Sequence, residues 1–119
     1  MNLFDIIDFK NGVLSNKNAC LLFNVDLKDQ KYNLVEDIVQ IEFNSLDSAF
    51  VDIGWYPEDF EIEKNSFFLV RAFKDSSWDN IIYKKKCKSI SELKSAIEES
   101  IQIINTPLGW RGRHLDDEI

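Results

Sequence analysis

The 119-residue chain has little of what most catalytic and metal sites are built from. It contains one histidine, His114, together with two cysteines and four scattered glycines. A lone histidine has no second histidine with which to hold a metal, and no nucleophile lies near it in the sequence. The glycines form no phosphate-binding loop, and the acids do not follow calcium-loop spacing. We therefore expect no catalytic residue, no metal and no cofactor.

Long hydrophobic runs are also missing, although 45% of the residues are hydrophobic. A bilayer span needs about 20 consecutive apolar residues, so we expect no membrane segment. The first residues, MNLFDIIDFK, carry acids where a signal peptide has a basic flank. We expect a cytoplasmic chain that forms one domain over residues 1–119. In that compartment Cys20 and Cys87 are expected to be free thiols, each buried in a strand.

Positive charge is absent from one long segment. Between Tyr32 and Glu63 there is no Lys, Arg or His, whereas nine acids occur there. The sign reverses in KKKCK at 84–88, a run that suits an edge strand protected by charge. The net charge of −7 argues against nucleic acid as a partner. The charge pattern predicts a lopsided molecule with an acidic block in its middle third.

Alternating apolar residues predict a series of short strands, and FFLVRAF at 67–73 is added to them because it is rich in aromatic and branched residues. Turn-forming segments separate most of them, and none is interrupted by a helical pattern, which indicates an antiparallel meander. The expected strands are 20–27, 38–43, 49–56, 67–73 and 81–87.

The strongest helix signal lies near the C-terminus, over residues 89–105. Ser89 and Glu92 have capping-box spacing, and Asn105 followed by Pro107 provides a stop. The apolar residues of this segment recur at intervals of three and four and form one stripe: Ile90, Leu93, Ile97, Ile101 and Ile104. The predicted fold is therefore α+β, an antiparallel β-meander of about five strands with a long C-terminal helix packed on one face.

The two ends of the chain give weaker signals. LFDIIDF at 3–9 has the spacing of a short helical face, and Asn11-Gly12 predicts a turn. Residues 106–119 are expected to form an extended or mobile tail, docked through Leu108 and Trp110.

The stretch VDIGWYPEDFEIE at 51–63 combines a strand, a break and dense negative charge. Alternation places Trp55 on the inner face of the strand, and we assign Trp55 and Trp78 mainly to packing. Tyr56 and Phe60 remain as aromatic anchors beside the acids. Interface aromatics carry much of the affinity of a complex, and charge of one sign speeds association with an oppositely charged partner. An ordinary solvated acidic face explains the charge equally well.

A family resemblance rests on VDIGWYPE, on the aromatic strand FFLVRAF, on the tryptophan of SSWDN, and on the lysine-rich strand and amphipathic helix that follow. Over roughly residues 48–104 this arrangement resembles small immunity proteins of bacterial polymorphic toxin systems, including contact-dependent growth inhibition systems. The resemblance implies a non-enzymatic cytoplasmic protein that binds and neutralises one cognate toxin. Many such toxins are nucleases with basic clefts, which an acidic surface would match.

The leading hypothesis is therefore an immunity protein whose acidic, aromatic-anchored surface binds a basic, nuclease-like toxin. The residues expected to contact that partner are Glu36, Asp37, Glu42, Asp52, Tyr56, Glu58, Asp59, Phe60, Glu61 and Glu63. Two alternatives stay open. One is a nucleic-acid mimic that inhibits a host nuclease, and the other is a small hydrolase that uses a carboxylate pair such as Glu42 and Asp52.

Overall fold

A computed structural model describes residues 2–18, 20–43, 48–56 and 66–106. It contains a five-stranded antiparallel sheet in which every strand pairs with its neighbours in the chain, followed by one α-helix. The strands are β1 (Val13–Ser15), β2 (Val39–Phe43), β3 (Ala49–Tyr56), β4 (Phe67–Phe73) and β5 (Ile81–Cys87), and the helix is α1 (Ile90–Ile104). The predicted α+β meander with a C-terminal helix is confirmed.

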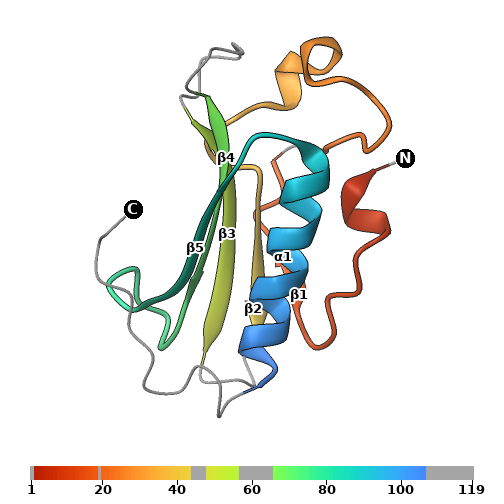
Figure 1. Ribbon diagram of the computed structural model, residues 1–119. Coiled ribbons are helices and arrows are strands. Elements are labelled where there is room, and N and C mark those ends of the chain that lie inside the picture. Colours follow the sequence, from red (N-terminus) through yellow and green to blue (C-terminus); the bar gives the residue numbers. More distant parts are fainter. Residues whose placement is uncertain (1, 19, 44–47, 57–65, 107–119) are drawn as a thin grey trace.

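Helix α1 lies across one face of the sheet and packs against β3, β4 and β5 (Figure 1). All five residues of its predicted apolar stripe are buried. The Ser89 hydroxyl accepts the Glu92 backbone N–H at 3.1 Å, as the capping box predicts, and the Glu92 carboxylate accepts the N–H of Lys88. At the other end the Asn105 side chain donates to the carbonyl of Ile101. This face of the sheet therefore provides the main hydrophobic core.

The N-terminal segment covers the same core beside α1 (Figure 1). It forms one 3-10 turn, η1 (Leu3–Asp5), which the Asn2 side chain caps through the Phe4 N–H. The predicted turn follows at Lys10 and Asn11. Leu3 and Phe4 are buried, so even this short helix contributes to the core.

The strand predicted at 20–27 is wrong. The segment makes a single bridge, between Leu22 and Asn2, and then turns into the 3-10 helices η2 (Leu27–Asp29) and η3 (Lys31–Asn33). The buried Gln30 side chain accepts the Leu22 N–H and donates to the carbonyls of Leu22 and Val25. These contacts take the place of hydrogen bonds to a neighbouring strand, and β1 is the fifth strand instead.

The two cysteines also differ from each other. Cys87 is buried in β5, where burial raises the pKa of its thiol to about 11. Cys20 is exposed and lies outside the strands, which corrects the prediction that it is buried in one. Both are free thiols, as expected. Within the described ranges, no helix combines the length and apolar character needed to cross a membrane.

Replacement of Gln30 by leucine should destabilise the protein. Gln30→Leu has a similar volume but removes three hydrogen bonds from partly buried backbone groups, so we expect a loss of about 2–3 kcal/mol in the free energy of unfolding. Urea denaturation followed by circular dichroism measures it. Gln102→Leu, at an exposed position of α1, is the matched control and should change stability by less than about 0.5 kcal/mol. Equal midpoints for the two variants would contradict the role given to Gln30.

Candidate functional site

The face of the sheet opposite α1 carries polar and aromatic residues in ordered rows, and we call it the open face. One polar row crosses all five strands, because the strand registers place Ser15 opposite Gln40, Gln40 opposite Asp52, Asp52 opposite Arg71, and Arg71 opposite Lys84. Cross-strand partners share a face, so this row is a direct consequence of the register.

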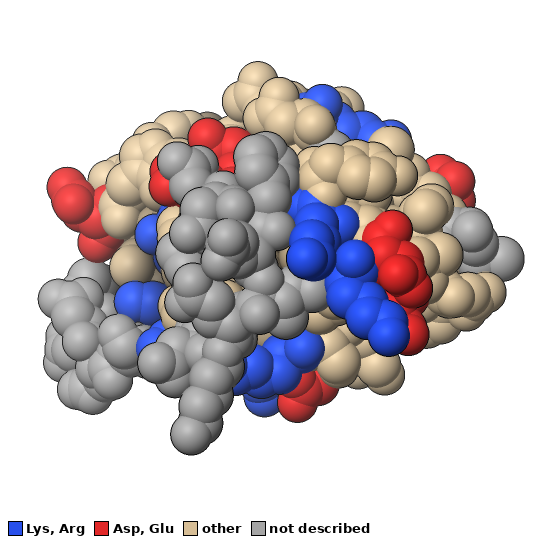
Figure 2. Space-filling model, turned by 90° about the horizontal axis from the view of Figure 1, so that it is seen from above, with Lys and Arg blue, Asp and Glu red and all other residues tan. Residues whose placement is uncertain are grey.

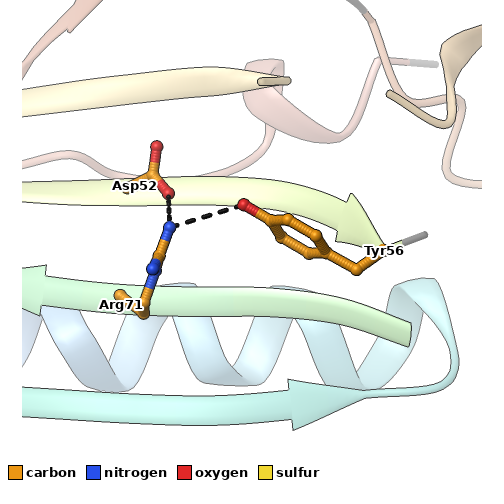
Figure 3. Close-up of polar contacts among 3 residues, drawn as sticks. All are labelled: Asp52, Tyr56 and Arg71. Carbon is orange, nitrogen blue, oxygen red and sulfur yellow. Dashed lines mark hydrogen bonds and ion pairs between the residues drawn. The ribbon is translucent and has the colours of Figure 1, made fainter. Parts of the chain in front are cut away.

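Asp52 and Arg71 form the centre of the polar row. Arg71 Nη2 lies 2.9 Å from Asp52 Oδ2 and 3.4 Å from the Tyr56 hydroxyl, so one guanidinium from β4 contacts two residues of β3 (Figure 3). Asp52 is only 2% exposed. Burial raises the pKa of its carboxyl above the usual range, while Arg71 opposes that rise through its hydrogen bond and its charge. Burial also raises the pKa of Tyr56.

An aromatic cluster lies next to the polar row. Phe50 of β3 and Phe73 of β4 stack with ring centroids 4.7 Å apart, and Trp78 meets them edge-on at 5.0 and 4.8 Å. The Arg71 guanidinium lies over the Trp78 ring, 5.6 Å from its centroid. Trp78 nevertheless keeps 51% of its surface exposed. It is therefore a firmly held aromatic side chain with one half accessible.

The loop that carries Trp78 is tied down by its own backbone. Lys74 donates its N–H to the Asn80 carbonyl at 3.1 Å, which closes the loop at its base. Ser76 donates its N–H to the Ser48 carbonyl at 2.9 Å, and this bond joins the loop to the start of β3. Asp75 and Ser76 of this loop have positive φ, as does Ser48. These backbone hydrogen bonds hold the loop that carries Trp78 in place.

Two acids reach the open face through an irregularity beside β3. Ile38 donates its N–H to the Ile53 carbonyl, and Trp55 donates to the Val35 carbonyl, so Glu36 and Asp37 fall between two regular pairings. The Glu36 carbonyl approaches Gly54 so closely that a Cβ at position 54 would overlap it. This approach explains the glycine within GWY, since any side chain there would displace the segment.

The structure brings some of the predicted contact residues together on the open face. Asp37, Asp52 and Gln40 line a notch beside Trp78, and Glu42 lines another. Glu36 lies near Tyr56, where its charge adds to the rise in the tyrosine pKa. Glu58, Asp59, Phe60, Glu61 and Glu63 lie outside the described residues, as does the tail from 107 to 119, including His114 and the docking residues Leu108 and Trp110.

Two sequence expectations need correction. Asp52 is buried and paired with Arg71, whereas a solvated position was expected. Glu42 and Asp52 do lie on neighbouring strands, as expected, where Glu42 pairs with Phe50 and Asp52 pairs with Gln40. Trp78 was assigned mainly to packing, but half of its surface is exposed. Trp55, by contrast, is 1% exposed and packs in the core as predicted.

Arg71 is the central residue that the sequence reasoning missed. It is the only charged residue of FFLVRAF, and a lone charge within an apolar strand is a signal that a buried partner exists. Lys86 is a second omission, since its ammonium lies 4.7 Å from the Phe67 ring centroid on β4.

The open face is divided by charge. Acids lie on its β2 and β3 side, while Arg71, Lys84 and Lys86 belong to β4 and β5. Seen from above, at one end of the sheet, blue Lys and Arg side chains and red Asp and Glu side chains lie next to one another (Figure 2). β5, with its lysines, is an edge strand as predicted.

Comparison with known proteins adds no assignment. No protein-family model, no curated protein and no solved structure matches this chain. Among the described residues, no group of three or more His, Cys, Asp or Glu side chains is arranged to hold a metal ion.

Loss of Arg71 should destabilise the fold in a pH-dependent way. Arg71→Leu leaves the Asp52 carboxylate buried without its cation. The free energy of unfolding at pH 7 should fall by about 2–3 kcal/mol, which is less than for a fully buried pair because the Arg71 side chain is a quarter exposed. Without the guanidinium the folded-state pKa of Asp52 rises further. The folded variant then binds a proton more readily than the unfolded chain. Its deficit in the free energy of unfolding relative to wild type should therefore shrink as the pH falls from 7 towards 4.

Urea denaturation of wild type and variant at both pH values measures this deficit. The double variant Asp52→Asn/Arg71→Leu has no carboxylate at position 52, and its deficit should be smaller at pH 7 and nearly independent of pH. A deficit of Arg71→Leu that is equal at the two pH values would show that lost packing, and not the unpaired carboxylate, accounts for the destabilisation.

Proposed function

We propose that this chain is an immunity protein that neutralises a cognate toxin domain by binding it through the acidic half of the open face. By the acidic half we mean the three acids Glu36, Asp37 and Glu42 together with the aromatic residue beside them, Trp78. The resemblance of residues 48–104 to bacterial immunity proteins supports the class of function, and the geometry of the open face supports the choice of surface.

The observation that carries the proposal is the half-exposed, preorganised Trp78. Its inner edge packs on Phe50 and Phe73, and its loop is bonded to Ser48. A side chain already held in place loses little conformational entropy on binding, so more of its contact energy becomes affinity. Tryptophan is also among the residues most often found as interface hot spots.

Electrostatics support a basic partner. The acidic half contributes three carboxylates, while the nearby Arg71 is already paired with Asp52. Charge of one sign around an aromatic anchor attracts an oppositely charged protein and raises the association rate. A nuclease-type toxin has a basic substrate cleft of this kind, which makes it the favoured class of partner.

The function is tested with the product of the gene directly upstream. Expression of that protein's C-terminal domain should arrest growth, and co-expression of this chain should restore growth and yield a complex of the two purified proteins. Absence of a complex, or continued arrest, would overturn the immunity function.

The surface is tested by Trp78→Ala. We expect the affinity for the toxin domain to fall by about thirtyfold, corresponding to about 2 kcal/mol for a hot-spot aromatic. Isothermal titration calorimetry measures it, with circular dichroism as the check that the variant is folded. Tyr32→Ala is the matched control, because Tyr32 is 70% exposed but lies in η3, outside the sheet. Equal affinity of wild type and Trp78→Ala would move the interface elsewhere on the molecule.

A further inference from the structure

We infer that the notch between Trp78 and Glu42 is a receptor for a single basic side chain, an arginine or lysine of the protein partner. This inference rests on the proposed function for the identity of the partner, but the chemistry of the notch can be tested without it.

The notch has a volume of about 230 Å³ and lies at the β2–β3 end of the open face. Trp78 and Phe50 supply its aromatic wall, Glu42 and Gln40 supply a carboxylate and an amide from β2, and Ser48 and Ser76 close it. The Ser76 N–H donates to the Ser48 carbonyl, so a backbone hydrogen bond connects the two residues that close the notch at this end.

An aromatic face beside a carboxylate is the arrangement that recognises an organic cation. The ring attracts the cation through its quadrupole, and the carboxylate pairs with it and accepts its N–H donors. Trp78 already has one guanidinium, that of Arg71, over its ring at 5.6 Å. Glu42 lines the same notch as this ring, so a second cation in the notch can contact both.

Glu42 is available for this role. No described residue forms a salt bridge or hydrogen bond with its carboxylate, and the side chain is partly exposed. Its two cross-strand partners, Phe50 of β3 and Val13 of β1, are apolar, so neither neutralises the negative charge.

A second notch, of about 300 Å³, is also lined by Trp78, together with Asp37 and Asp52. It suits a cation less well. Its buried carboxylate, Asp52, is already bonded to Arg71 and is therefore less able to pair with an incoming cation than Glu42. We therefore place the basic side chain on the Glu42 side.

The test uses the full ¹⁵N-labelled chain and the probe N-acetyl-arginine amide. The probe should shift the indole N–H signal of Trp78 saturably, with the signal assigned from Trp78→Phe. The neutral isostere N-acetyl-citrulline amide should produce no such shift. Glu42→Gln should weaken arginine binding by about fivefold, the size expected for one exposed charge contact, whereas Asp37→Asn should change it less than twofold.

Each contrary outcome overturns a defined part of the inference. Equal shifts from citrulline would mean that the notch does not select charge, and an unchanged affinity in Glu42→Gln would remove Glu42 from the site. A larger effect of Asp37→Asn would place the cation in the other notch. Failure of the toxin to bind would overturn the proposed function but leave the arginine titration standing. If Glu42→Gln binds the toxin with full affinity, the notch has no role in the complex, and its binding of arginine is unaffected by that result.

Discussion

The buried ion pair between Asp52 and Arg71 is the constraint on which the open face depends. Two charges taken out of water stabilise a fold little, and an apolar pair of similar volume commonly does as well. In this fold the pair fixes the positions of the side chains around it. One guanidinium contacts Asp52 and Tyr56 on β3 and also lies over Trp78 from the β4–β5 loop. The pair therefore links two strands and a loop into one surface, and its members cannot move independently.

The two faces of the sheet divide the physical tasks of the molecule. The face under α1 is apolar and contains the largest buried side chains, so it supplies the hydrophobic stabilisation. The open face instead contains charges and partly exposed rings. β3 serves both: Val51, Ile53 and Trp55 point into the core, while Asp52 and Gly54 belong to the other side. The VDIGWY stretch is thus a central strand whose alternate residues perform different roles.

The sequence predicted the parts of the fold that depend on local periodicity. β3 and β5 follow from alternation, β4 from its aromatic and branched residues, and the helix from a three-four repeat, and their boundaries agree with the structure to within one residue. The 20–27 segment failed because a side chain, Gln30, satisfies its backbone, and no apolar pattern reveals that. The burial of Asp52 was also hidden, since it depends on Arg71, nineteen positions later, and on the register between β3 and β4.

Trp78 shows where packing ceases to be a sufficient explanation. Covering Phe50 and Phe73, which are 9% and 1% exposed, accounts for the buried half of its ring. A leucine or a smaller aromatic could cover them while exposing less apolar surface. Its ring, 51% exposed, lines two notches that both contain carboxylates, and backbone hydrogen bonds hold its loop in place. A single exposed hydrophobic side chain is common on protein surfaces, so what distinguishes Trp78 is its fixed position beside these two notches.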